Sequence, residues 1–276
     1  MTIWKHSEVG HSQDAAQKLK VLFDGKDYFD YPKSVVLIKR IVQLYSATTD
    51  FILDFFGGSG TTAQAVLELN KEDGGNRKFI LVQLPEPCDE NSEAYKAGYK
   101  TIAAISKERI RRVIKKINTQ GEEVNKKKEG ELKFDNLNNP ANNSLDNGFK
   151  VFRLSQSNFK IWRGDEITED NLVTQLDAFV NPAKEESKTS NMLYELMLKA
   201  GYSLTDKVEA KDKYYSIKDG ELIIALEEIN GTVIDAIIKA HPKKVISVDN
   251  LFTGNDQLKT NTVLQMKDAG IDFKTI

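Results

Sequence analysis

Residues 51–62 read FILDFFGGSGTT, and this stretch decides the fold. A short apolar run ends in an acid and two aromatic residues, and three glycines and three hydroxyl residues follow. Helix-forming residues continue to about Leu69, DGGNR breaks the chain, and KFILVQL (78–84) is a second apolar run. Apolar runs without polar alternation suit strands that are buried on both faces. The order strand, glycine turn, helix, strand predicts a parallel βαβ unit of a doubly wound α/β sheet.

The flanking sequence extends this pattern. Helices are expected over about 12–23, from Pro32 to about Tyr45, and over about 92–118, and GFKVFRL predicts a third strand at 148–155. If the first strand lies at an edge of this sheet, we expect self-association or a helix that covers the edge.

A polar, asparagine-rich stretch divides the chain into two parts. We expect a first α/β part over 1–118, a linker or loop over 119–147, and a smaller C-terminal α/β domain over 148–276. Asparagine favours turns over helix interiors, which is why the middle stretch is read as a linker. In the last part ELIIALEE, KKVISVD and IDFKTI alternate with helical sequence.

Composition excludes several classes of protein. With 40% hydrophobic and 29% charged residues, the chain has the composition of a soluble globular protein. Its single cysteine, Cys88, excludes an internal disulfide framework and favours a cytoplasmic setting. No apolar run of about 18 residues is present, so no membrane partner is expected. The three histidines and Cys88 lack the spacing of metal ligands, so no metal site is expected.

The glycine turn has the chemistry of a ligand site. Ligands of open parallel sheets bind beyond the carboxyl ends of the strands, where glycine lets the backbone approach them closely. The N-terminus of the next helix suits a carboxylate or phosphate, and Ser59, Thr61 and Thr62 are expected to cap it. The alternative is a tight strand-to-helix turn without a ligand.

The spacing narrows the choice of ligand. A Walker phosphate loop requires a lysine after its last glycine, and none follows Gly60. The spacing of a dinucleotide fingerprint is also not matched, although a nicotinamide-dependent dehydrogenase with an irregular fingerprint stays an alternative. A zwitterionic nucleoside with a carboxylate tail fits better, and S-adenosylmethionine (AdoMet) has this structure.

The stretch LDFFGGSGTT resembles the AdoMet-binding motif of DNA amino-methyltransferases. FDYPKSVVLIKRI, directly before it, resembles their companion motif, and this order is that of the beta arrangement. Over nearly its whole length the chain resembles the modification subunit of type III restriction–modification systems. The resemblance implies a partial Rossmann-like AdoMet-dependent methyltransferase sheet, followed by a smaller C-terminal α/β domain.

The resemblance also implies which residues bind the cofactor. The glycine motif would line the methionine and sugar side of AdoMet, and the companion motif would form the other wall. One of two polar residues after the second strand would hydrogen-bond the ribose. These residues are Asp54, Phe55, Phe56, Gly57, Gly58, Ser59, Gly60, Thr61 and Thr62; Tyr31, Pro32, Lys33 and Ser34; and Gln83 or Glu86.

The catalytic motif of the family is absent. Methylation of a flipped base uses Asp, Asn or Ser followed by Pro-Pro and an aromatic residue, and no two of the six prolines here are adjacent. The chain is therefore expected to be the C-terminal part of a modification subunit, with no catalytic residue of its own. The resemblance implies methylation of adenine N6 by the complete subunit, with DNA, a restriction subunit and a second copy as partners. The alternative is a non-catalytic module that docks subunits.

Residues 107–116, KERIRRVIKK, are strongly basic. One interpretation is a helix that contacts DNA phosphates. The favoured one is a solvated helix face whose isoleucines and valine point inward.

Overall fold

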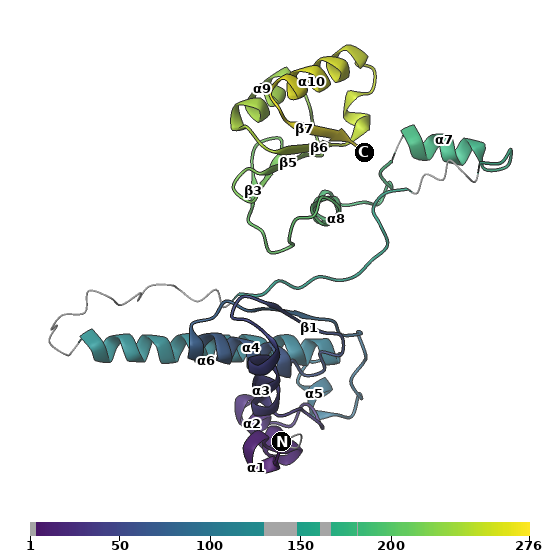
Figure 1. Ribbon diagram of the computed structural model, residues 1–276. Coiled ribbons are helices and arrows are strands. Elements are labelled where there is room, and N and C mark those ends of the chain that lie inside the picture. The colour runs from purple at the N-terminus through teal and green to yellow at the C-terminus, as the bar shows by residue number, and fades with distance from the viewer. Residues whose placement is uncertain (1–3, 130–147, 161–166, 181) are drawn as a thin grey trace. The chain divides into compact units, whose positions relative to one another are not determined.

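The structure is a computed structural model of two compact units, Met1–Phe149 and Lys150–Ile276, which are considered separately (Figure 1). It describes residues 4–129, 148–160, 167–180 and 182–276. The first unit contains α1 His6–Val9, α2 Ser12–Leu22, α3 Val35–Tyr45, β1 Phe51–Asp54, α4 Thr61–Asp73, β2 Lys78–Leu81, α5 Glu93–Lys96 and α6 Ile102–Glu129. Across these described ranges, no helix has both the length and the apolar character needed to cross a membrane.

The predicted βαβ unit forms the centre of the first unit. β1 and β2 pair in parallel, with Asp54 opposite Leu81. α4 connects the two strands and packs against both α3 and α6. Its residues Ala63 and Leu67 share a buried cluster with one face of α6, against which Phe79 and Leu81 of β2 also pack. Helices therefore cover one face of this small sheet.

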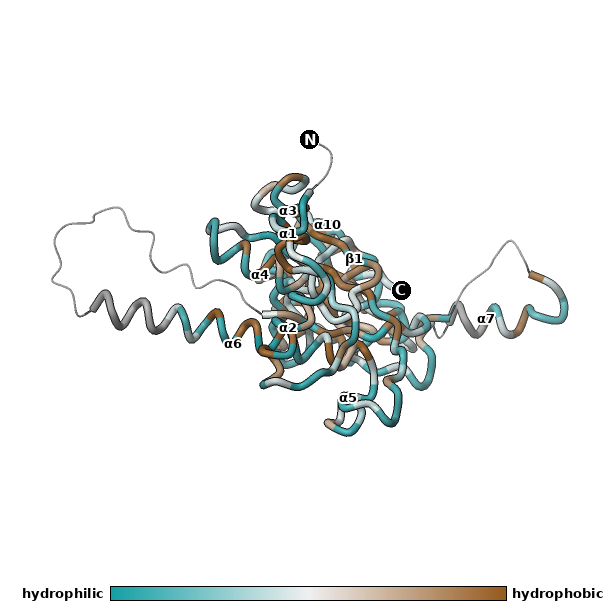
Figure 2. Tube along the Cα trace, turned by 90° about the horizontal axis from the view of Figure 1, so that it is seen from below, coloured by the Kyte–Doolittle hydropathy of each residue, from teal (hydrophilic) through white to brown (hydrophobic). Residues whose placement is uncertain are grey.

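The other face of the sheet is bare in the described part of the chain. Side chains alternate across a strand, so the residues between the covered ones point to the opposite side. We call this side the bare sheet face. Its exposed apolar residues are Phe51, Leu53, Ile80, Val82 and Leu84, Lys78 lies on it over the Phe51 ring, and Phe55 is exposed in the turn that follows β1. Figure 2 shows the hydrophobic colouring of the trace at β1. Parallel sheets are normally covered on both faces, so this surface is unusual.

The structure differs from three expectations for the first half of the chain and the segment after it. The helix expected over 92–118 is interrupted at Gly98, whose φ of +96° ends α5, and restarts after Thr101, whose hydroxyl accepts a hydrogen bond from the Ala104 N–H. α6 then continues to Glu129, so the first residues of the expected linker are helical. Residues 148–155 form no strand, because no described strand lies beside them to complete their backbone hydrogen bonds. The rest of the expected linker, 130–147, lies outside the described residues.

The second unit is built on a five-stranded sheet in the order β3-β4-β5-β6-β7. The last three strands are parallel and the first two are antiparallel additions. α8 packs on one face, and α9 and α10 on the other. The elements are α7 Leu172–Val180, α8 Thr189–Lys199, β3 Val208–Ala210, β4 Tyr215–Ile217, β5 Leu222–Ala225, α9 Gly231–Ala240, β6 Lys244–Ser247, the 3-10 turn η1 Asp249–Phe252, α10 Asp256–Asp268 and β7 Asp272–Thr275.

The chain is thus a mixed α/β protein, as predicted. The sequence runs predicted at β5, β6 and β7 are strands, and β5 is buried along its whole length. The hairpin β3–β4 was not predicted. Its strands have three residues each, which is too short for a clear alternation of apolar and polar side chains.

Candidate functional site

The glycine turn lies between the carboxyl ends of β1 and β2. The Gly57 N–H donates to the Val82 carbonyl at 3.0 Å, and the Gly58 N–H donates to Gln83 Oε1 at 2.7 Å. The Gly60 N–H closes the turn by donating to the Gly57 carbonyl at 2.7 Å. The end of β2 therefore fixes the conformation of the turn that follows β1.

Asp54, the last residue of β1, braces the same turn from the other side. Its Oδ1 accepts a hydrogen bond from the Phe56 N–H at 3.0 Å, and its Oδ2 accepts one from the Thr62 hydroxyl at 2.6 Å. One carboxylate thus connects the strand, the turn and the first turn of α4. The predicted site residue Asp54 has a structural task that does not require a ligand.

The three glycines of the turn have different roles. At Gly60 (φ +84°) a Cβ would lie 2.7 Å from Ser106 Oγ, so glycine is needed for contact with α6. At Gly57 a Cβ would lie 3.2 Å from the Leu81 Cβ. Gly58 (φ +51°) has more room, with the ring of Phe29 as the nearest side chain at 3.7 Å. Close packing therefore explains two of the glycines, whereas Gly58 is half-buried and a Cβ there would make only ordinary contacts.

The N-terminus of α4 has no side-chain cap, contrary to the expectation for Ser59, Thr61 and Thr62. The N-cap position is Gly60, which has no side chain, and the three hydroxyls are engaged elsewhere. Among the described residues, no backbone or side-chain acceptor meets the N–H groups of Thr61, Thr62 and Ala63. The free N–H groups of a helix start need acceptors, which water or a ligand supplies when the protein does not.

Arg109 of α6 occupies the space beneath this turn. Its Nη1 donates to Ser59 Oγ at 2.7 Å and to Thr61 Oγ1 at 2.8 Å, and its Nε donates to Gln64 Oε1 at 2.8 Å. The residue is only 2% exposed. Burial lowers the pKa of its guanidinium to about 10, against a smaller opposing influence of Glu68, so the group remains a cation at neutral pH.

The favoured interpretation of the basic stretch was therefore only partly right. Ile110 and Val113 are buried, as expected for an inward face, but Arg109 is buried with them. The signal that reveals this is the i, i+4 spacing of Ile105, Arg109, Val113 and Ile117, which places all four on one side of the helix.

The companion segment contacts the turn with the ring of Phe29, which borders Gly58. Phe29 is not among the predicted site residues. Pro32 is buried, whereas Tyr31 and Lys33 are exposed. Ser34 is the N-cap of α3: its hydroxyl accepts from the Leu37 N–H at 3.4 Å and donates to the Val9 carbonyl at 2.6 Å. Ser34 thus has a structural role like that of Asp54.

The two candidates for a ribose contact differ in whether their side-chain polar atoms already form hydrogen bonds. Gln83 uses its Oε1 to hold Gly58, and its Nε2 donates to the Leu84 carbonyl at 3.2 Å. Glu86 is exposed. Of the aromatic pair before the glycines, Phe56 is 90% exposed and also borders the turn.

The comparisons with known proteins include a match to the same part of the chain. Residues 1–86, which contain every predicted cofactor residue, match the family described as DNA methylase. Over 147 residues, or 53% of its length, the chain is 42% identical to the Mod subunit of the type III restriction–modification enzyme StyLTI from Salmonella typhimurium. This chain is Mod-subunit-like.

Other relatives extend the similarity of the Mod-like chain. The Mod subunit of the type III enzyme EcoP15I from Escherichia coli is 28% identical over 263 residues, which cover 91% of this chain. The type II methyltransferase M.KpnI from Klebsiella pneumoniae is 38% identical over 109 residues, or 40% of this chain. The Mod-like chain spans only part of these proteins: 20% of the StyLTI subunit, 36% of the EcoP15I subunit and 26% of M.KpnI.

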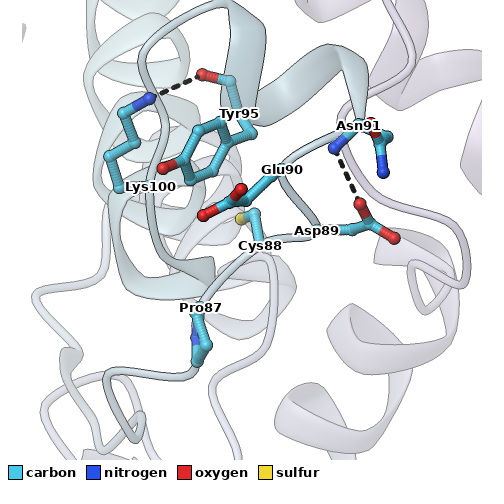
Figure 3. A pocket seen from close by; sticks show the side chains of 7 residues that line it. All are labelled: Pro87, Cys88, Asp89, Glu90, Asn91, Tyr95 and Lys100. Carbon is cyan, nitrogen blue, oxygen red and sulfur yellow. Dashed lines mark hydrogen bonds between the residues drawn. The ribbon is translucent and has the colours of Figure 1, made fainter.

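A shallow hollow follows β2 in the Mod-like chain (Figure 3). None of the predicted cofactor residues lines it; its lining is Pro87, Cys88, Asp89, Glu90, Asn91, Tyr95 and Lys100. Lys100 Nζ lies 3.4 Å from the centre of the Tyr95 ring and donates to the Tyr95 carbonyl, so its charge is already engaged. Burial and the nearby Glu86 raise the pKa of the Cys88 thiol, which disfavours a reactive thiolate.

Proposed function

We propose that the Mod-like chain binds AdoMet at the turn Gly57–Gly60 and is the cofactor-binding part of a site-specific DNA adenine-N6 methyltransferase of a type III restriction–modification system. The observation that carries this proposal is the uncapped N-terminus of α4. Its free N–H groups follow a glycine turn at the carboxyl ends of two parallel strands, which is where α/β sheets bind ligands. The similarity to Mod subunits supports DNA modification as the setting.

The residues around the turn fit the parts of AdoMet. The N–H groups of Thr61, Thr62 and Ala63 would donate hydrogen bonds to the carboxylate. The proposed partners of the ribose hydroxyls are the Glu86 carboxylate and the Gln83 Nε2 hydrogen that does not bond to Leu84. The companion segment beside Gly58 would form the other wall of the site. AdoMet supplies an activated methyl group, and the task of these residues is to orient it and shield it from water.

The target base requires groups that this sequence does not contain, because it lacks a Pro-Pro-aromatic motif. We propose that another polypeptide segment carries that motif, covers the bare sheet face, and adds strands to the edges of β1 and β2 to complete a Rossmann-like sheet. The exposed apolar side chains of that face support this arrangement, because parallel sheets are stable when both faces are covered. DNA, a restriction subunit and a second Mod copy are the proposed partners of the complete assembly.

A second candidate is a non-catalytic docking module whose glycine turn is vestigial and binds no ligand. It is favoured by the structural tasks of Asp54 and Gly60, both of which are explained without a ligand. The two candidates differ in one property, the binding of AdoMet.

Calorimetric titration with AdoMet tests the proposal. Wild-type chain should bind, and Asp54→Ala and Gly58→Val should abolish binding. A matched control is Gly201→Val, because Gly201 also has a positive φ (+84°) but lies in the second unit. This control should bind as the wild type does. Failure of the folded wild type to bind, alone and with the segment carrying the Pro-Pro-aromatic motif, would favour the docking module. Tighter binding of a nicotinamide dinucleotide than of AdoMet would favour a dehydrogenase.

A further inference from the structure

Arg109 is a buried cation that forms no ion pair with any residue the structure describes. The three side chains to which it donates hydrogen bonds, Ser59, Thr61 and Gln64, are all neutral. The nearest acid in this network is Glu68, which is reached only through Gln64: Gln64 Nε2 donates to Glu68 Oε1 at 2.8 Å. Glu68 also lies 3.9 Å from Lys39 Nζ, so its charge is shared. A buried charge is costly when nothing nearby compensates it.

The position of this charge is specific. Ser59 and Thr61 are the residues on either side of Gly60, and both hydroxyls point to the guanidinium. The cation therefore lies directly behind the backbone at which α4 begins. The free N–H groups of that helix start already create a positive potential of about half a charge. Arg109 adds a full charge of the same sign, in surroundings where water screens it poorly.

We propose that Arg109 is the positioning residue that makes the glycine turn select a ligand bearing a carboxylate. It acts from behind the turn, through Ser59 and Thr61 and through its field, and does not touch the ligand. This inference rests on the proposed function for the identity of the ligand, AdoMet. It goes beyond that function by naming the group that gives the site its preference for an anion.

A purely structural role makes a different prediction. If Arg109 only filled space and supplied hydrogen-bond donors, its loss would weaken the turn for every adenosine ligand alike. If its charge matters, the loss falls on the ligand with the carboxylate. AdoMet and decarboxylated AdoMet differ only in that group, so the ratio of their dissociation constants isolates the effect of the charge.

The experiment measures this ratio for the wild-type chain, Arg109→Met and Arg109→Lys, with circular dichroism to establish that each is folded. Wild type should favour AdoMet by roughly tenfold or more, the range expected for a hydrogen-bonded charge. In Arg109→Met the ratio should fall several-fold but stay above one, because the N–H groups of Thr61, Thr62 and Ala63 still donate to the carboxylate. In Arg109→Lys most of the preference should return. Gln64→Leu is the matched control, because it removes a partner of Arg109 and leaves the charge. Its ratio should stay as in the wild type.

The outcomes separate this inference from the proposed function. If wild type binds AdoMet and Arg109→Met keeps the wild-type ratio, the selecting role is wrong and the proposed function stands. Equal weakening of both ligands in Arg109→Met would likewise assign Arg109 a structural role only. If Arg109→Met does not fold, the comparison of Arg109→Lys with Gln64→Leu decides. A fall in the ratio with Gln64→Leu as large as any seen at Arg109 would overturn the electrostatic argument.

Discussion

The Thr62 hydroxyl donates a hydrogen bond of 2.6 Å to Asp54 Oδ2, so that the first turn of α4 is tied to the last residue of β1. With the Phe56 N–H on the other carboxylate oxygen, this contact fixes the path of the chain through the glycine turn. The acid that resembles part of a cofactor motif thus shapes the turn, and any effect on a ligand acts through that shape.

Thr62→Val should destabilise the first unit by about 1–2 kcal/mol, because it removes a hydrogen bond to a charged group without changing the side-chain volume. Thr62→Ser retains the hydroxyl and should cost less. Urea unfolding followed by circular dichroism measures both. Equal stability of Thr62→Val and the wild type would mean that the contact does not hold the turn.

Gly60→Ala should be more damaging than Gly74→Ala, although both residues flank α4 and have similar positive φ values of +84° and +70°. Both alanines incur a left-handed backbone cost of about 1–2 kcal/mol. Only at position 60 does the new Cβ also collide with Ser106 Oγ, at 2.7 Å, whereas nothing lies within 4 Å of position 74. The collision adds about 1–3 kcal/mol.

The double variant Gly60→Ala with Ser106→Gly should regain part of the loss measured by thermal unfolding, because it removes the colliding hydroxyl. If the two single alanine variants unfold at the same temperature, the close approach of the turn to α6 is not a constraint.

The bare sheet face predicts opposite results for two neighbouring residues of β2. Ile80→Ser, on the bare face, should change the free energy of unfolding by less than about 0.5 kcal/mol and should reduce self-association in sedimentation velocity. Leu81→Ser, which faces the helices, should destabilise by about 2–4 kcal/mol. A wild type that remains monomeric at high concentration, or an Ile80→Ser variant that unfolds as readily as Leu81→Ser, would contradict the assignment of the two faces.

Glu195 in α8 should make the second unit sensitive to acid. Burial raises the pKa of its carboxyl, but hydrogen bonds from Lys199, Ser157 and Asn158 outweigh burial and lower it to about 2. Because the folded-state pKa is depressed, the stabilisation is complete above about pH 4.5 and is lost as the pH falls towards 2.

The expected loss over that window is on the order of 2–3 kcal/mol. Glu195→Gln should be less stable than the wild type at neutral pH and should flatten the dependence of unfolding on pH. A wild type whose second unit keeps its stability from pH 5 to pH 2 would contradict this assignment; amide hydrogen exchange in β5 is a suitable measure.

The predicted parts of the fold are those with a strong local signal. The buried runs of β1, β2 and β5 and the glycines at position 57 and after could be recognised from hydrophobicity and turn chemistry alone. The break at Gly98 was missed because a single glycine is tolerated in many helices. The expected strand at 148–155 failed because strand formation depends on a neighbouring strand, which sequence periodicity does not reveal.

The candidate site was predicted less completely than the fold. The resemblance pointed to the glycine turn, which stays a proposal, but the hydroxyls expected to cap α4 instead meet Arg109 and Asp54. The contacts with Arg109 join residues about 50 positions apart. From composition alone, an arginine in a basic helix is expected to be solvated. Only the i, i+4 spacing of Arg109 from the buried residues of α6 indicates that it is buried.

The most direct test of the central claim is a titration of isotope-labelled chain with AdoMet, followed by the backbone amide signals in nuclear magnetic resonance spectra. If the turn binds AdoMet, the amide signals of Thr61, Thr62 and Ala63 should shift with saturable dependence on the AdoMet concentration, while those of β6 should not. The same amides should not shift in Gly58→Val. If the folded chain binds AdoMet without moving these amides, or if they remain unmoved at every concentration, the glycine turn is not the cofactor site.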